Sequence, residues 1–124
     1  MSRSKDAVGK RRRAETRGRK GEALAAWYLR LKGWRILARR VRTPRGEIDL
    51  VARCGGTVSF VEVKWRMTSA ELDLAIDAYR LKRVAAAVEA VAHRFARPDD
   101  TRRIDVILLA PGRWPRHIVN AWMP

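Results

Sequence analysis

The sequence predicts a single α/β domain in which helices flank a mixed central sheet. Apolar residues recur at helical spacing before residue 33 and again after residue 70. Between these segments, and again after the second one, lie short runs of strand-forming residues bounded by Gly or Pro. The resulting order, helix, three strands, helix and two strands, is typical of a mixed sheet covered by helices. At 124 residues the chain is long enough to bury one core.

The first 14 residues differ in composition from the rest of the chain. They include the basic run Arg11, Arg12 and Arg13 and show no apolar periodicity. We therefore expect a disordered basic arm over residues 1–14 and one folded domain over residues 15–124. The three arginines are candidate contacts for nucleic acid. The alternative is a solvated tail without a specific role.

Residues 15–32 have the pattern of an amphipathic helix, and Gly33 follows as a residue that ends a helix. The apolar stripe expected to face the core consists of Leu24, Trp27, Tyr28 and Leu31. A short strand is expected over residues 34–41, and a turn containing Pro44 and Gly46 ends it.

Two further strands, residues 47–53 and 57–64, are joined by Cys54, Gly55 and Gly56. Two glycines between strand-like runs are a strong hairpin signal because the tight turns of hairpins require positive φ. The cysteine in this turn has no nearby base, and we expect it to be an exposed free thiol.

The second half of the chain predicts a long helix followed by two strands. The helix is expected over residues 71–97, with Thr68 or Ser69 as its cap. Its apolar stripe consists of Leu81, Val84, Val88, Val91 and Phe95. Residues 103–109 form a compact apolar strand, and residues 117–122 are expected to form an edge strand.

The predicted hairpin places charged residues where a strand usually carries none. With a two-residue loop, Asp49 lies opposite Glu62 and Glu47 lies opposite Lys64, all on one face. A three-residue loop would instead send Asp49 to the other face. We expect Glu47 to face solvent or to pair with Lys64.

Opposed carboxylates repel each other, and a hard divalent cation removes that penalty. Mg²⁺ is typically held by one or two carboxylates together with water and phosphate oxygens. Lys64 points to the same side as Glu62 and can orient a water or stabilise charge on a phosphate. The pattern therefore favours a site for Mg²⁺ or Mn²⁺. The alternative is a salt-bridge ladder on the solvent face of the hairpin.

The charge balance indicates the class of partner. The chain has 28 Lys and Arg against 13 acidic residues, a net charge of +15. Such a field attracts polyanions, of which nucleic acid is the commonest, with anionic lipid or a ribosome surface as alternatives. No run approaches the roughly 18 apolar residues of a membrane-spanning helix. We therefore expect no membrane partner. The single cysteine excludes an internal disulfide, which favours a reducing cytoplasm as the location.

The order of the acidic motif matches a known superfamily. Asp49, followed on the next strand by Glu62-Val63-Lys64, resembles the D…ExK signature of the restriction-endonuclease-like superfamily. The surrounding segments, residues 46–53 and 60–64, resemble the YraN-like family of bacterial proteins, which is related to archaeal Holliday-junction resolvases. Further matches are Gly21-Glu22-Ala23-Leu24-Ala25, Arg103-Ile104-Asp105-Val106 and Asn120-Ala121-Trp122.

This resemblance implies a restriction-endonuclease-like fold and a metal-dependent nuclease that acts on DNA, including branched or damaged DNA. It implies that Asp49 and Glu62 are ligands of Mg²⁺ or Mn²⁺, that Lys64 is the catalytic lysine and that Glu22 is an added ligand or an acid that holds a water. For Glu22 the alternative is a helix N-terminal carboxylate that favours the macrodipole. Arg45 and Arg66 are predicted as further contacts to nucleic acid, and a homodimer is compatible with the resemblance.

Two departures from the family and one additional acid complete the prediction. The family commonly has Lys-Gln early in the second helix, where this chain has Arg80-Leu81. Trp65 stands where a small polar residue is usual, and we expect it to serve in packing, with base stacking as the alternative. Asp105, alone on an apolar strand, is expected to satisfy a backbone group or an arginine.

The alternatives to a nuclease are a non-catalytic nucleic-acid-binding protein with the same fold and a ribosome-associated factor.

Overall fold

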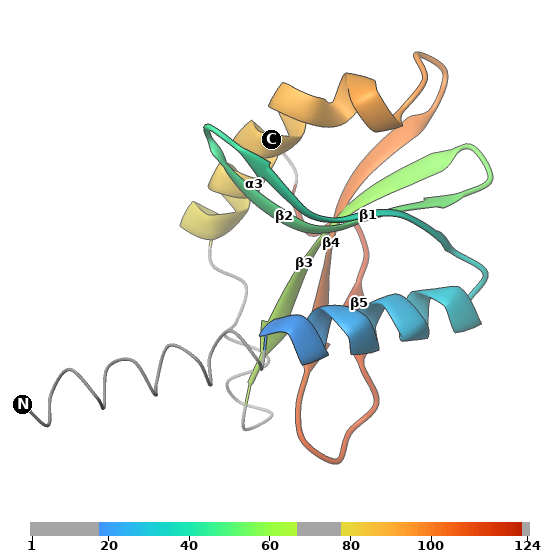
Figure 1. Ribbon diagram of the computed structural model, residues 1–124, viewed down its shortest axis with the longest axis vertical. Helices are drawn as coiled ribbons and strands as arrows, with labels where there is room; N and C mark the ends of the chain where they lie inside the picture. Colours follow the sequence, from blue (N-terminus) through green and yellow to red (C-terminus); the bar gives the residue numbers. More distant parts are fainter. Residues whose placement is uncertain (1–17, 67–77, 123–124) are drawn as a thin grey trace, which may run out of the picture.

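The computed structural model describes residues 18–66 and 78–122 (Figure 1). The predicted arm with Arg11, Arg12 and Arg13 lies outside these residues. The Thr68 or Ser69 cap and the start of the second predicted helix lie outside them as well. Within the described ranges, no helix is both long enough and apolar enough to cross a membrane.

The described residues form one five-stranded mixed sheet with the strand order β1-β2-β3-β4-β5. The strands are β1 (Arg35–Thr43), β2 (Gly46–Cys54), β3 (Thr57–Trp65), β4 (Thr101–Leu109) and β5 (Arg116–Ile118). The β3–β4 pair is parallel and the other three pairs are antiparallel. The predicted α/β fold class is thus confirmed. The last strand is shorter than expected, because residues 119–122 leave the ladder and Asn120 takes a left-handed conformation with φ 54°.

A helix covers each face of the sheet (Figure 1). The first helix, described over residues 18–31, packs on one face, and α3 (Ala78–Phe95) packs on the other. The α3 stripe predicted from the sequence is correct. Its buried members are Leu81, Val84, Val88 and Val91, with Phe95 partly buried against the same core.

The first helix packs through a different face from the one predicted. Ala25, Ala26 and Leu29 are fully buried, whereas Trp27 is 47 % exposed and Leu31 is 62 % exposed. Both sets follow the i, i+3, i+4 spacing that places residues on one helix face. The small side chains of Ala25 and Ala26 let this face of the helix approach the sheet closely, and Trp27 and Leu31 remain outside. The predicted apolar stripe is therefore the outer face of this helix.

The β2–β3 hairpin has the predicted two-glycine turn, but its strands separate near the acidic residues. Cys54 pairs with Thr57, and the ladder continues to the pair Leu50 and Val61. Gly55 has a φ of 58°, as a tight hairpin turn requires. The expected pairs of Asp49 with Glu62 and of Glu47 with Lys64 are not part of this ladder. Beyond Leu50, β2 continues to pair with β1 alone, as far as Gly46.

Strand β2 also turns at Asp49. Residues two apart on a regular strand face the same side of a sheet. Ile48, however, packs in the core beneath α3, and Leu50 packs in the core beneath the first helix. Asp49 therefore lies where the side chains of β2 switch from one face of the sheet to the other, and where β2 stops pairing with β3. This position opens the sheet beside a carboxylate.

Candidate active site

A pocket of about 330 Å³ lies where β2 and β3 separate. It is lined by Gly46, Glu47, Asp49, Glu62, Val63, Arg80, Arg83 and Val84. Its walls come from β2, β3 and α3, and two arginines lie among the lining residues. The separation of the strands thus brings Asp49 and Glu62, both predicted as site residues, into one cavity without a backbone pair between them.

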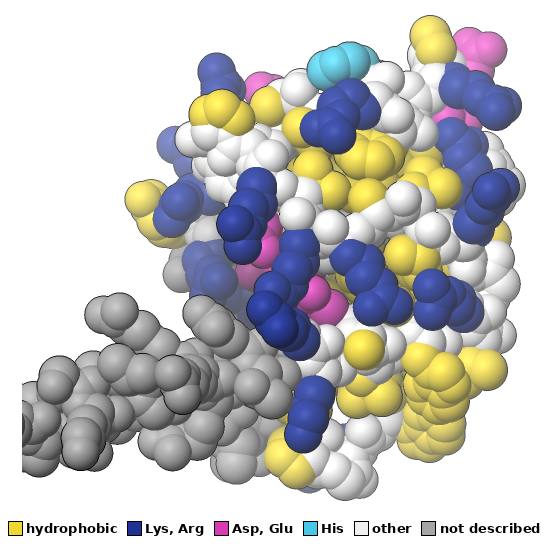
Figure 2. Space-filling model, in the orientation of Figure 1, with side chains coloured by type: hydrophobic (Ala, Val, Ile, Leu, Met, Phe, Trp, Pro, Cys, Tyr) yellow, Lys and Arg dark blue, Asp and Glu magenta, His cyan; other side chains and the backbone are white. Residues whose placement is uncertain are grey.

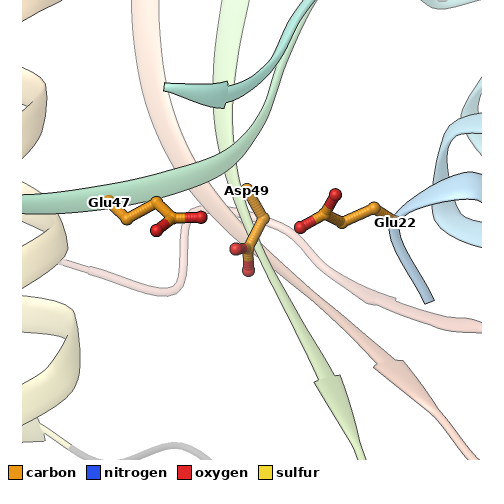
Figure 3. Close-up of side chains that lie close together, drawn as sticks. All are labelled: Glu22, Glu47 and Asp49. Carbon is orange, nitrogen blue, oxygen red and sulfur yellow. The ribbon is translucent and has the colours of Figure 1, made fainter. Parts of the chain in front are cut away.

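Three carboxylates point toward one another at this split (Figure 3). Glu47 and Asp49 come from β2, and Glu22 comes from the first helix. One carboxylate oxygen from each lies within 4.8 Å of those of the other two. Such a group of hard oxygen donors has the chemistry and the approximate spacing that a divalent cation uses. Glu47 is exposed to solvent, as expected, but it also lies with these two acids, and its ion pair is with Arg42 at 3.9 Å instead of with Lys64.

Asp49 is held by the backbone of the neighbouring strand. Its Oδ2 accepts a hydrogen bond of 2.7 Å from the Val63 N–H, at a point where a backbone carbonyl of β2 would otherwise accept it. Burial, followed by the negative charge of Glu62, raises the pKa of Asp49 to about 7, while the Val63 hydrogen bond opposes this shift. The Asp49 carboxyl group is therefore expected to be about half protonated near neutral pH.

Glu22 is almost buried and is neutralised by an arginine that the sequence analysis did not single out. The Nε of Arg40 lies 3.0 and 2.7 Å from the two carboxylate oxygens of Glu22. This hydrogen bond raises the pKa of Arg40. Arg40 has a φ of 51°, in the left-handed region that non-glycine residues rarely adopt. In the β1–β2 ladder the residues on either side of Arg40 pair with Leu50 and Ile48, so Arg40 lies across from Asp49.

The residue before Glu22 sets the depth at which the first helix docks. A Cβ atom added at Gly21 would lie 2.5 Å from Nε1 of Trp65, closer than side-chain atoms approach. Trp65 packs against the core formed with the first helix, as the packing interpretation predicted. Gly21 therefore lets the helix approach β3 closely enough for the next residue, Glu22, to reach the split in the sheet.

Glu62 lies in a second part of the site, beside the cationic side chains of Lys64 and Arg80. Glu62 and Lys64 are buried, and Lys64 Nζ lies 4.0 Å from Glu62 Oε1. Arg80 of α3 approaches the same oxygen at 3.4 Å. Burial raises the pKa of Glu62, and the charges of Arg80 and Lys64 oppose that shift. Glu62 thus lines the same pocket as Asp49 but is paired with cations instead of joining the three-carboxylate group.

One of the departures from the family pattern falls at Arg80 and Leu81. Where Lys-Gln is common, this chain places the Arg80 guanidinium beside Glu62 and buries Leu81 against the C-terminal end of the sheet. A cationic side chain therefore still faces the acidic residues from α3, although the amide is absent.

The predicted nucleic-acid contacts differ in their surroundings. Arg45 is exposed in the turn between β1 and β2. Arg66 is half-buried just after β3, and its Nη1 donates a 2.6 Å hydrogen bond to the Trp65 carbonyl. Figure 2 shows Lys and Arg side chains on both sides of the acidic groups near the centre of this face. A polyanion that approached the split would meet these cations first.

Asp105 has the structural role predicted for it. It is fully buried in β4 and accepts hydrogen bonds from Arg103, at 3.2 and 2.9 Å, and from the Asn120 N–H at 2.8 Å. His117 Nε2 lies 2.8 Å from the same carboxylate, and its Nδ1 lies 2.9 Å from Lys32 Nζ. These contacts attach β5 and the segment after it to the sheet and to the end of the first helix. Together they lower the pKa of Asp105 despite its burial.

The split mixed sheet, the acidic pocket at the split and the helix on each face define a restriction-endonuclease-like domain. Residues 21–109, most of the chain, match the uncharacterised protein family UPF0102, and the chain belongs to this family. The predicted resemblance to YraN-like proteins is thereby confirmed.

Similar proteins of this family occur in several bacteria. The UPF0102 protein of Erythrobacter litoralis is 68 % identical over 115 residues, which cover 93 % of this chain and 99 % of the relative. The UPF0102 protein of Sphingopyxis alaskensis is 66 % identical over 111 residues, 90 % of this chain and 96 % of the relative. That of Rhizorhabdus wittichii is 54 % identical over 115 residues, 93 % of this chain and 98 % of the relative.

Proposed function

We propose that the protein is a metal-dependent nuclease that hydrolyses phosphodiester bonds in DNA, with branched or damaged DNA as its substrate class. The observation that carries this proposal is the convergence of Glu22, Glu47 and Asp49 at the split in the sheet, next to the buried pair of Glu62 and Lys64. A cluster of hard oxygen donors beside a buried lysine suits the cleavage of a phosphate ester better than a structural role.

The donor set fits Mg²⁺ or Mn²⁺. Asp49 and Glu22 would hold the cation, with Glu47 as the third carboxylate in reach. Glu62, the ligand that the resemblance implies, lines the same pocket within reach of Lys64 and Arg80. When bound, such a cation supplies a Lewis acid for a phosphate oxygen and lowers the pKa of a bound water. The raised pKa of Asp49 supports this fit, because burial and the negative charge of Glu62 raise it and a nearby positive charge opposes both effects.

Lys64 and the α3 arginines supply positive charge for the substrate. The Lys64 ammonium is buried beside Glu62, so its charge acts in a region where water screens it little. There it can donate a hydrogen bond to the attacking water or to a phosphate oxygen that gains charge. Arg80 and Arg83 line the pocket from α3 and are exposed, so they can contact the flanking phosphates. Glu62 holds Lys64 and Arg80 in place.

The experiment compares cleavage with metal binding in the same variants. A labelled four-way DNA junction and a linear duplex are incubated with wild type, Asp49→Asn and Lys64→Ala, in Mn²⁺, Mg²⁺ or EDTA. We expect cleavage by wild type in either metal and none by the two variants. Melting temperatures with and without Mn²⁺ should show stabilisation of wild type and Lys64→Ala but not of Asp49→Asn. Glu89→Gln removes an exposed carboxylate of α3 outside the site and should behave as wild type.

Two results would contradict the proposal. An equal Mn²⁺ response in wild type and Asp49→Asn would remove the metal site. A normal metal response without cleavage of any nucleic acid would instead favour the alternative function, a nucleic-acid-binding protein that keeps the nuclease fold without its activity.

A further inference from the structure

The outer face of the first helix carries an exposed aromatic surface. It consists of Leu24, Trp27 and Leu31 from the helix and Trp114 from the segment between β4 and β5, and we call it the tryptophan patch. Trp114 is 74 % exposed, and its ring stacks on that of Trp27 with centroids 6.3 Å apart and planes 5° from parallel. Figure 1 shows the chain between β4 and β5 passing beside this helix. Two large apolar rings thus lie parallel and exposed to solvent, although burying them would be energetically favourable.

The surroundings of the patch are cationic. Within described residues 18–34 the only acid is Glu22, which is nearly buried and paired with Arg40. Residues 110–118 contain no Asp or Glu. The exposed cations of these two segments are Arg19, Lys20, Arg30, Lys32, Arg113 and Arg116. A partner that fits this surface must therefore combine negative charge with flat apolar groups.

We propose that the tryptophan patch binds unpaired bases of a single DNA strand, an inference that rests on the proposed nuclease function. Every base presents a π face that can stack on an aromatic side chain, and the phosphates that flank it can reach the cations. A duplex hides its base faces within its own stack, so it would gain little from the patch. A second copy of the chain would bring the same cations and its own net charge of +15 against them.

The patch and the proposed metal site lie on the same helix. Trp27 follows Glu22 by five residues, which corresponds to about 7.5 Å of helical rise and to a position well around the helix axis. A strand stacked on Trp27 would therefore lie on the outer face of the helix whose inner face carries Glu22. Branched DNA presents unpaired bases close to a phosphodiester bond in a duplex arm, so one substrate can occupy both sites.

Binding in EDTA separates this inference from catalysis. The affinity of a fluorescein-labelled single-stranded oligonucleotide and of the matching duplex is measured by anisotropy for wild type, Trp114→Ala, Trp27→Ala and Trp114→Phe. We expect each alanine variant to bind the single strand roughly 5- to 150-fold more weakly, the factor that corresponds to base stacking. Duplex affinity should change by less than about twofold, and Trp114→Phe should keep most of the affinity because it keeps a π face.

Charge and stacking can be told apart by salt. The slope of log affinity against log salt should be the same in Trp114→Ala as in wild type, because no ionic contact is lost. Arg30→Ala, on the same helix, should instead reduce the slope by roughly 0.7 for a single strand. Val119→Ala, which trims an exposed apolar residue outside the patch, should match wild type.

Several outcomes would overturn the inference. Equal loss of single-strand and duplex binding would mean that the tryptophans act through the fold, which thermal melting of the same variants would also reveal. A dimer in sedimentation that Trp114→Ala dissociates would make the patch an interface between copies, and tighter binding of the matching RNA would exclude DNA as the ligand. Wild type that binds no nucleic acid would remove the proposed function too. Wild-type affinity in the tryptophan variants would remove this inference alone.

Discussion

The Arg40 side chain in β1 donates through its Nε to both carboxylate oxygens of Glu22, at 3.0 and 2.7 Å. The backbone of Arg40 is in the left-handed region, which costs a non-glycine residue on the order of 1 kcal/mol. This conformation persists because it directs the guanidinium at a nearly buried carboxylate. Arg40 thus neutralises Glu22 in the metal-free protein, and it lies where a bound cation would act on the same group.

Arg40→Ala should lower the free energy of unfolding of the metal-free protein by about 1–3 kcal/mol. The variant leaves the nearly buried Glu22 carboxylate without its cationic partner. Mn²⁺ should recover part of the loss, because it supplies the missing charge. Urea unfolding with and without Mn²⁺ measures both effects. Arg39→Ala, an exposed neighbour in β1, should cost less than about 0.5 kcal/mol, and an equal loss in the two variants would contradict a role for the Glu22 contact.

The raised pKa of Asp49 predicts a pH dependence of stability. Between pH 5 and 7 the folded, metal-free protein binds a proton on this group that the unfolded chain has released. The free energy of unfolding should therefore fall as the pH rises through 7, by on the order of 2 kcal/mol between about pH 5 and 8. Because Mn²⁺ competes with this proton, stabilisation by Mn²⁺ should grow over the same range.

Asp49→Asn is the matched control for this pH dependence. Its side-chain oxygen can still accept the hydrogen bond from the Val63 N–H, but it has no proton to release. We expect the variant to be as stable as wild type near pH 5 and more stable at pH 8, with no gain from Mn²⁺. Stability curves that run parallel for the two proteins would show that the titrating group is elsewhere.

The hairpin and the long helix could be predicted from sequence because their signals are local. The two-glycine turn fixes the first pairs of the β2–β3 ladder, and the α3 stripe identifies its buried face. The separation of the strands at Asp49 could not be predicted in the same way. It depends on a side chain of β2 that accepts the hydrogen bond of a β3 backbone group, and strand alternation assumes that the ladder continues.

The candidate site was predicted in its residue types but not in its grouping. Glu22 was assigned through the resemblance, and the structure brings its carboxylate beside Asp49 and Glu47. The contacts of Arg40 and Arg80 with the acids depend on packing between different elements of the fold. The spacing of residues within one element does not predict such contacts. For the first helix two stripes had equal spacing, and the tight contact of Gly21 with Trp65 selects the one with small residues. A glycine directly before an acidic residue was the available signal for that contact.

Asp105→Ala should destabilise the fold without affecting the metal site. The change leaves the Arg103 guanidinium and the Asn120 N–H without their buried acceptor, and it removes the contact with His117. We expect a loss of about 2–4 kcal/mol in the free energy of unfolding. The shift in melting temperature on adding Mn²⁺ should equal that of wild type. A loss of the Mn²⁺ response at temperatures where the variant is folded would show that Asp105 acts on the site.

The structure and the family resemblance differ in the residue that supplies the third carboxylate of the proposed metal site. Glu47 lies with Glu22 and Asp49, whereas Glu62 is paired with Lys64 and Arg80. Glu47→Gln should therefore weaken Mn²⁺ binding about tenfold or more, as measured by calorimetry, at little cost in stability because its ion pair with Arg42 is exposed. Glu62→Gln should weaken Mn²⁺ binding less but abolish cleavage, because Lys64 and Arg80 lose the charge that holds them. If Glu62→Gln alone abolishes Mn²⁺ binding, the cation draws Glu62 away from its two cationic partners, and Glu47 is a surface acid.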